Sequence, residues 1–268
     1  MKRLDIVLHE RGLAESREQA RRMVMAGAVL VNGQKALKPS QPTRDEDALD
    51  ILRESPYVSR GGFKLEKALR EFRIDPAGRV AADIGASTGG FTDCMLQAGA
   101  VKVYAVDVGY GQLHQKLRDD PRVVVMERTN ARYLTTEAFA EPPAMATIDV
   151  AFISLRLILP PLLACVAPGA DIVALVKPQF EAEARHLKKG VVRDAAVHEQ
   201  VLRDMLSWLR TQPASVRGLS FSPITGPKGN IEFLLHLSAG EAPWDQPDFA
   251  AVVRRAHEEV KHNPLSDG

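Results

Sequence analysis

Residues 80–90, Val80-Ala81-Ala82-Asp83-Ile84-Gly85-Ala86-Ser87-Thr88-Gly89-Gly90, decide the fold of this chain. An apolar run typical of a buried strand passes directly into a loop of small residues, and a helix is predicted from Gly89 to Gly99. Small residues let the backbone turn sharply and approach a ligand closely at a helix N-terminus. The stretch therefore predicts a cofactor loop, although a plain tight turn between strand and helix remains an alternative. The candidate binding residues are Asp83, Gly85, Ala86, Ser87, Thr88, Gly89, Gly90 and Phe91.

The same alternation of strand and helix continues on both sides of this loop. Strands are predicted over residues 79–84, 101–106, 123–126, 146–150 and 171–176, and helices over 63–72 and 248–261. This rhythm is typical of parallel strands with helices on both faces. The predicted fold class is α/β, a doubly wound Rossmann-like sheet, preceded by a small α+β domain.

Two acidic residues narrow the choice of cofactor. The loop alone is compatible with NAD, a nucleotide or S-adenosylmethionine, but it is neither G-x-G-x-x-G nor a Walker motif. Asp83 lies inside the strand, where it can serve the amino group of a methionine moiety. Asp107 closes the next strand, where it can accept hydrogen bonds from ribose hydroxyls. These residues favour S-adenosylmethionine, with Asn130 as a further candidate near the adenine, and no metal site is predicted.

The overall charge hides a local concentration of basic residues. The chain has 268 residues, 45% of them hydrophobic, and a formal net charge of +1, which by itself argues against a nucleic-acid partner. Residues 1–38, however, hold eight basic and four acidic side chains, while residues 39–54 hold two basic and five acidic ones. The basic residues indicate either a nucleic-acid surface or a solvated helix face.

Cysteine use and hydropathy indicate a cytoplasmic location. Cys94 and Cys165 are not spaced as a metal or redox pair, which fits a reducing compartment. The most apolar region, residues 155–176, is interrupted by three prolines and an aspartate, so no membrane span and no membrane partner are expected. The N-terminus shows no secretory signal. The oligomeric state is left open.

The first 54 residues form a separate predicted unit. A short helix ends near Gly12, and Ser16 with Gln19 forms a capping box for a helix over residues 17–26 that Gly27 ends. Asn32-Gly33 predicts a tight hairpin. Together with the Arg3-Leu4-Asp5 start, this arrangement resembles the S4 RNA-binding domain. The resemblance implies RNA binding through basic side chains, for which the candidates are Arg3, Arg17, Arg21 and Arg22.

Seven short sequence motifs distributed along the chain carry more information than the spacing of apolar and polar residues. They are Ser59-Arg60-Gly61-Gly62-Phe63-Lys64-Leu65, Asp83 to Thr92, Asp107 to Leu113, Glu127 to Arg132, Phe152 to Leu155, Leu175 to Glu181 and Gly226 to Glu232. Taken together, they resemble the TlyA family, whose members are known both as hemolysin A and as rRNA 2′-O-methyltransferases. The catalytic half is similar to the FtsJ/RrmJ-type methyltransferases. The resulting division is an S4-like domain over residues 1–58, with a linker near residues 55–62, and a methyltransferase domain over residues 59–268.

The resemblance implies an enzyme with S-adenosylmethionine as cofactor and ribosomal RNA or a ribosomal subunit as partner. It implies methylation of a cytidine 2′-hydroxyl by a tetrad matching Lys64, Asp149, Lys177 and Glu232, with Asp149 also near the cofactor. Ala151 departs from the serine that is common in the family. The hydroxyl is a poor nucleophile, so we expect a lysine whose pKa is lowered by burial and by the second lysine, with Lys177 closest to the hydroxyl.

Three other functions remain open at this point. They are a membrane-active cytolysin, an S4-containing pseudouridine synthase and a non-catalytic RNA-binding protein. A basic segment, Lys188-Lys189-Gly190 with Arg193, predicts an exposed loop where an RNA contact is one option.

Overall fold

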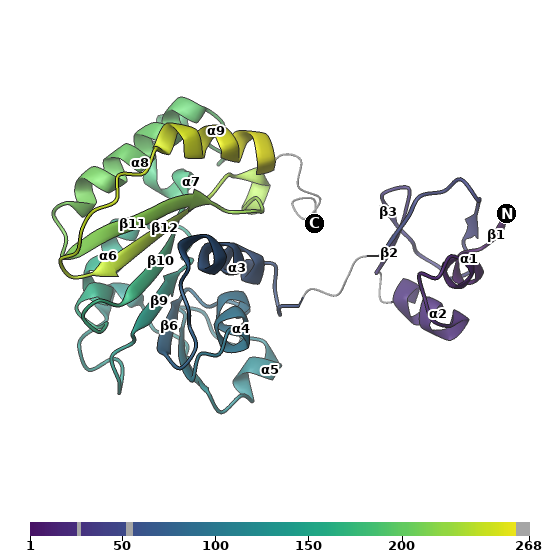
Figure 1. Cartoon of the computed structure of the whole chain (residues 1–268), viewed down its shortest axis with the longest axis horizontal. Helices are drawn as coiled ribbons and strands as arrows, with labels where there is room; N and C mark the ends of the chain where they lie inside the picture. Colours follow the sequence, from purple (N-terminus) through teal and green to yellow (C-terminus); the bar gives the residue numbers. More distant parts are fainter. Residues whose placement is uncertain (26–27, 52–55, 261–268) are drawn as a thin grey trace. The chain divides into compact units, whose positions relative to one another are not determined.

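Two units make up the chain, Met1–Pro56 and Tyr57–Gly268, in a computed structural model that describes residues 1–25, 28–51 and 56–260 (Figure 1). The sequence places the division two residues later, after residue 58. The predicted helix C-cap at Gly27 and the start of the predicted linker lie outside the described residues.

The first unit packs two helices against short strands. Its core consists of apolar side chains from both helices and from the central strand, including Leu4, Leu8, Val24 and Val29. Strand β1 pairs with β4, and β2 lies between β3 and β5, all antiparallel. The elements are β1 (Lys2–Arg3), α1 (Leu4–Glu10), α2 (Arg17–Met25), β2 (Val29–Val31), β3 (Gln34–Lys35), β4 (Pro42–Thr43) and β5 (Leu49–Ile51).

The predicted hairpin and capping box are both present in this unit. Asn32 and Gly33 connect β2 to β3 with φ of 52° and 76°, which is the two-residue turn that this pair favours. Ser16 Oγ accepts a hydrogen bond from the Gln19 N–H at 3.2 Å. The return bond of the box goes to the Glu15 N–H rather than to Ser16 itself, with 2.6 Å between Glu15 N and Gln19 Oε1.

The second unit is built on a seven-stranded sheet in the order β11-β12-β10-β9-β6-β7-β8. Strands β8, β7, β6, β9 and β10 are parallel, and these are the five strands that the sequence predicts. The sheet also contains two strands outside that predicted set, β11 and β12, and β12 runs antiparallel to both of its neighbours. The strands are β6 (Val80–Ile84), β7 (Lys102–Val106), β8 (Val123–Met126), β9 (Met145–Ile148), β10 (Asp171–Val176), β11 (Ala214–Phe221) and β12 (Phe233–Ala239).

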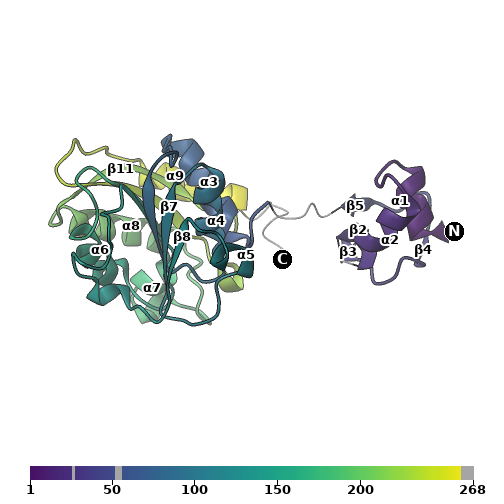
Figure 2. The same ribbon diagram turned by 90° about the horizontal axis from the view of Figure 1, so that it is seen from below.

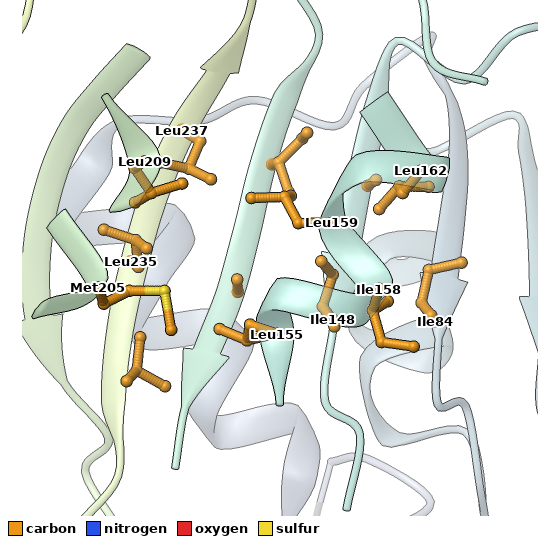
Figure 3. Packing of buried hydrophobic residues seen from close by; sticks show 14 of the residues in the cluster. Ile84, Ile148, Leu155, Ile158, Leu159, Leu162, Met205, Leu209, Leu235 and Leu237 are labelled. Atoms are coloured by element: carbon orange, nitrogen blue, oxygen red, sulfur yellow. The ribbon is translucent and has the colours of Figure 1, made fainter. Parts of the chain in front are cut away.

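Helices cover both faces of this sheet, which gives three layers (Figure 2). One face packs against α3 (Gly61–Phe72), α4 (Gly90–Gln97) and α5 (Gln115–Arg118). The other face packs against α6 (Leu155–Leu163), α8 (Ala195–Leu209) and α9 (Phe249–Glu259). Figure 3 shows this second core, where Leu155, Leu159 and Met205 lie against the sheet. Short helices lie between the strands: η1 (Ala131–Tyr133), α7 (Pro178–Glu181), η2 (Ala184–His186) and η3 (Pro227–Gly229).

Strand β6 shows why these residues suit a sheet with two covered faces. Val80, Ala82 and Ile84 face one core, and Ala81 faces the other, as the two-residue period of a strand requires. Asp83 therefore points to the same side as Ala81, toward α4.

The predicted linker is shorter than expected, because Gly61 and Gly62 form the first turn of α3. The Gly62 and Phe63 N–H groups donate to the carbonyls of Ser59 and Arg60 at 3.1 and 3.2 Å. Within the described ranges, none of the helices is both long enough and apolar enough to cross a membrane.

Candidate active site

Four charged residues meet at one edge of the sheet because of how its strands end. Asp149 directly follows β9 and Lys177 directly follows β10. Glu232 directly precedes β12, whose first residue pairs with the last residue of β10. Because β12 is reversed, its beginning lies at the edge where the parallel strands end. The first turn of α3 adds Lys64 from the neighbouring layer.

The four side chains form a continuous chain of ion pairs. Lys177 Nζ lies 2.5 Å from Asp149 Oδ1, and Asp149 Oδ2 lies 3.5 Å from Lys64 Nζ. Lys64 Nζ lies in turn 2.6 Å from Glu232 Oε2. Side-chain exposure ranges from 0% for Glu232 to 19% for Asp149, so water screens these charges weakly. The structure thus brings together all four residues of the predicted tetrad.

The electrostatics of the tetrad differ from the expectation for Lys64. Burial alone would lower the pKa of Lys64, but the carboxylates of Asp149 and Glu232 outweigh burial, and the pKa is raised. Burial alone would raise the pKa of Asp149, whereas the ammonium groups of Lys64 and Lys177 lower it. A lowered lysine pKa from mutual repulsion is therefore wrong for Lys64, because two carboxylates contact that ammonium group.

Two adjoining cavities open beside the tetrad. The first, of about 590 Å³, contains the tetrad in its wall together with the glycine loop. The second, of about 430 Å³, is lined largely by apolar side chains such as Val108, Val150 and Ile153. The two cavities share Gly85, Ser87, Asp149 and Ala151 in their walls, so they lie side by side along the glycine loop.

The predicted cofactor residues distribute over these two cavities. The first is lined by Asp83, Gly85, Ala86, Ser87, Thr88, Gly90 and Phe91, and the second by Asp107 and Asn130. Gly89 lines neither; it is the N-cap of α4, with a φ of 99°. Position 85 requires glycine because the backbone of Asp149 packs directly against it: a Cβ there would lie 2.8 Å from the carbonyl oxygen of Asp149.

Asp107 and Asp83 both hold the loop in place. Asp107 accepts hydrogen bonds from the backbone N–H groups of Ser87 at 2.8 Å and Gly109 at 2.7 Å. Asp83 is fully buried and accepts from both the N–H and the hydroxyl of Thr92, at 2.9 and 2.7 Å, and from the Thr147 hydroxyl at 3.0 Å. Burial, against these hydrogen bonds, raises the pKa of Asp83 to about 6.

Ser154 and Glu181, two residues of the motif phrases to which the sequence analysis gave no role, meet at the start of α6. The Glu181 carboxylate accepts from the Ser154 hydroxyl at 2.6 Å and from the Leu155 N–H at 2.8 Å. Burial raises the pKa of Glu181 despite these bonds. The hydrogen bonds of Glu181 with Ser154 and Leu155 therefore connect the loop after Asp149 to the short helix after Lys177.

The sequence analysis also gave no role to Phe152, which lines the second cavity, or to Asn230, which lies near the first. Phe152 is 90% exposed, has a φ of 64°, and its ring centroid lies 5.2 Å from that of Phe180. Asn230 is 3% exposed and joins two loops through its side chain. Their signals were present, since both residues lie inside the quoted phrases, but exposure and loop contacts are not visible in a sequence.

The four predicted RNA-binding arginines lie on the first unit. Two of them contact a buried carboxylate, and the other two are exposed on a helix. Arg3 forms a two-pronged hydrogen bond with the Asp5 carboxylate at 3.0 and 2.9 Å, and Arg17 lies 3.9 Å from the same group. The hydrogen bond from Arg3 contributes most to lowering the pKa of Asp5, against its burial. Arg21 and Arg22 are exposed on α2.

Comparisons with known proteins agree with this architecture. Residues 57–239 match the model of the FtsJ-like methyltransferases, and residues 2–49 match that of the S4 domain. YqxC of Bacillus subtilis, provisionally named an rRNA methyltransferase, is 54% identical over 97% of this chain and 95% of its own length. The 16S/23S rRNA (cytidine-2′-O)-methyltransferase TlyA of Mycobacterium tuberculosis is 43% identical over 99% of this chain and 98% of its own length.

A solved structure shares the fold of the whole chain. It is a hemolysin-type protein of Streptococcus thermophilus, 48% identical, with a TM-score of 0.78 and coverage of 98% of both chains. The order of domains, the tetrad edge and these similarities lead to one conclusion: the chain belongs to the FtsJ-like methyltransferase family, in its TlyA group, which carries an S4 domain ahead of the methyltransferase domain.

Proposed function

We propose that this protein transfers a methyl group from S-adenosylmethionine to the 2′-hydroxyl of a cytidine in ribosomal RNA. The observation that carries the proposal is the chain Lys177–Asp149–Lys64–Glu232 in the wall of a cavity that the glycine loop also lines. The names of the relatives support the substrate. A ribosomal substrate also supports a cytoplasmic location.

The two cavities fit the cofactor in size and chemistry. Gly85 and Ser87, which line both cavities, would hold the central part of S-adenosylmethionine. The apolar walls of the second cavity suit a flat adenine ring. Asp107 would contact the ribose with the lone pairs that the loop leaves unused. Asp83 would act by holding the start of α4 through Thr92. When bound, S-adenosylmethionine supplies a methyl group on a positively charged sulfur.

The tetrad residues would then have distinct roles. Lys64 contacts two carboxylates and remains an ammonium group, consistent with its raised pKa. Among the described residues, Lys177 has Asp149 as its one ion-pair partner. We assign Lys177, held by Asp149, to orient the hydroxyl as the oxygen–carbon bond forms and the sulfur–carbon bond breaks, with the hydroxyl proton leaving to water.

The first unit would hold the RNA while this reaction takes place. Arg21 and Arg22 are exposed on α2, and Arg3 and Arg17 are exposed beside Asp5. Contacts of such side chains with phosphates contribute affinity that weakens with salt and little sequence information.

A labelled methyl-transfer assay with ribosomal subunits and free rRNA tests the proposal, followed by mapping of 2′-O-methyl groups. We expect label on a cytidine ribose, and a loss of about 100-fold or more in single-turnover rate for Lys177→Ala. The control Lys102→Ala removes a lysine that pairs with Glu141 on the surface, and it should retain the full rate.

Binding of S-adenosylmethionine to Lys177→Ala should stay near wild type, which separates chemistry from cofactor binding. Full activity of Lys177→Ala would refute the assigned role. Label on a base, or on no ribosomal RNA at all, would refute the reaction.

A further inference from the structure

A basic surface lies on two loops next to the tetrad, and the proposed reaction does not use it. We call it the basic loop pair: Arg185, Lys188, Lys189 and Arg193 on one loop, and Lys228 on the other. All five side chains are exposed. The acidic residues among them are engaged, since Glu183 pairs with Arg185 and Asp194 caps α8. The surface therefore carries a local excess of positive charge.

Each loop presents a lysine at the tip of a tight turn. Lys189 and Gly190 have φ of 55° and 81°, and Lys228 and Gly229 have φ of 60° and 81°. Lys188 and Val191 exchange both backbone hydrogen bonds across the first turn, at 3.0 and 3.1 Å. The two turns touch, because a Cβ built on Gly190 would lie 3.4 Å from Lys228 Nζ. The left-handed backbone at Lys189 and Lys228 is unfavourable for a residue with a side chain. Local sterics alone therefore do not explain why lysine stands at these two positions.

A hollow of about 200 Å³ lies within the first loop. Arg185, His186, Lys188 and Arg193 line it. Arginine and lysine side chains donate strong hydrogen bonds to phosphate oxygens.

Asn230 connects this surface to the active site. Its side-chain amide donates to the carbonyls of Gly190 at 3.1 Å and Pro227 at 2.9 Å, and its side-chain oxygen accepts from the Val192 N–H at 3.2 Å. Asn230 lies two residues before Glu232. Gly226, on the same loop, lines the tetrad cavity and packs so closely on Glu232 that a Cβ there would lie 2.1 Å from Glu232 Oε1.

We propose that the basic loop pair binds backbone phosphates of the RNA strand whose ribose enters the tetrad cavity, and that Asn230 is a positioning residue that holds both turns for this contact. This inference rests on the proposed function. The second loop is both a wall of the cavity and part of the surface, so a strand bound in the cavity can reach the lysine turns. Phosphates are the group that such a strand presents regardless of its sequence.

The test measures RNA affinity of the full chain at several salt concentrations. The double variant Lys189→Gln/Lys228→Gln should bind an rRNA fragment more weakly, and the slope of log Kd against log salt should fall by about 1 to 2. A matched control, Lys102→Gln/Arg254→Gln, removes the same charge at a half-buried and an exposed position outside this surface and should keep the wild-type slope. Affinity for S-adenosylmethionine should be unchanged in both variants.

Asn230→Ala keeps all five cations, so a lower salt slope in this variant would support its positioning role. An unchanged slope in the double lysine variant would refute the phosphate surface, and an unchanged slope in Asn230→Ala would refute the positioning. Vesicles of phosphatidylglycerol test whether the surface binds lipid phosphates instead. If the double lysine variant lost binding to these vesicles but kept its RNA binding, the proposal would also be refuted. If wild-type protein methylates rRNA while these results are negative, only this inference fails; if it does not methylate rRNA, the proposed function fails independently.

Discussion

The two ends of β10 and β12 both carry a cluster of charged residues, yet the clusters differ in one decisive respect. At one end, Lys177 and Glu232 join Asp149 and Lys64 in the wall of a cavity. Toward the other end, Asp171 lies 2.7 Å from His236 Nε2 and 2.6 Å from Arg79 Nη1, and the His236 ring stacks on Phe72 at 5.3 Å.

In the Asp171 cluster, both oxygens of the central carboxylate accept hydrogen bonds. Burial alone would raise the pKa of Asp171, but hydrogen bonds from His236 and Arg79 lower it. The tetrad, in contrast, includes a buried carboxylate oxygen, Glu232 Oε1, that has no hydrogen-bond partner among the described residues, and the four residues line a cavity. The comparison teaches that burial and ion pairing alone do not mark an active site; adjoining empty space and incomplete satisfaction do.

The largest expected effect comes from replacing the central aspartate of each cluster. Asp149→Asn removes the carboxylate that both lysines contact, so single-turnover methyl transfer should fall by roughly 10²–10⁴-fold. Asp171→Asn should leave that rate within about threefold of wild type at a temperature well below unfolding, because Asp171 does not line the tetrad cavity. Its effect should be on stability, through lost hydrogen bonds worth roughly 1–3 kcal/mol.

Denaturant unfolding alongside the rate assay separates the two outcomes. Equal rate losses in folded samples of both variants would break the distinction between the clusters. A normal rate in Asp149→Asn would remove Asp149 from the mechanism.

A smaller effect is expected at Phe152, which lies at the mouth of the second cavity and is exposed. Stacking of a nucleobase on an aromatic ring contributes about 1–3 kcal/mol. Phe152→Ala should therefore raise the RNA concentration at half-maximal rate by about 5- to 100-fold, while Phe152→Tyr, which keeps the ring, should stay close to wild type. The free energy of unfolding should change little, because the side chain is 90% exposed. Equal RNA dependence of the alanine and tyrosine variants would rule out stacking.

The last expected effect concerns stability rather than rate and is a pH dependence from Asp83. Its pKa is about 6 in the folded chain against an ordinary value of 3.8, so the folded state binds the proton more tightly. This group therefore stabilises the fold below its unfolded pKa, and that contribution is lost as pH rises through about 6. The unfolding free energy of wild type minus that of Asp83→Asn should fall between pH 4 and 7, by about 1.4 kcal/mol per unit of pKa difference. Urea unfolding at several pH values measures this difference, and a flat profile would contradict the shifted pKa.

Much of the fold follows from local sequence signals. The strand ends at Ile84, Val106 and Val176 and the Asn32-Gly33 turn were predictable, because hydrophobic runs and turn residues act over a few positions. The reversed direction of β12 was not predictable, since it depends on pairing with β10 over a long separation along the chain. The first turn of α3 was also missed, because glycines usually indicate a linker, whereas here close packing on Tyr57 requires Gly62.

The candidate site divides in the same way. The family resemblance led to the four tetrad residues, and the structure brings them within ion-pair distance of one another. The charge state of Lys64 could not be predicted, because it depends on how many carboxylates reach a single ammonium group. The role of Asn230 needs three contacts across two loops, none of which has a local pattern in the sequence.

The reversal of β12 has a consequence for the order in which the protein becomes active during synthesis. Lys64, Asp149 and Lys177 are already present when the ribosome has translated β10, but Glu232 follows much later, just before a strand that must insert between β10 and β11. The tetrad is therefore complete only after the sheet has accepted its last strand in the correct register. An unfinished or misregistered chain contains the glycine loop but lacks the residue that neutralises Lys64, so this arrangement makes methylation a property of the finished molecule.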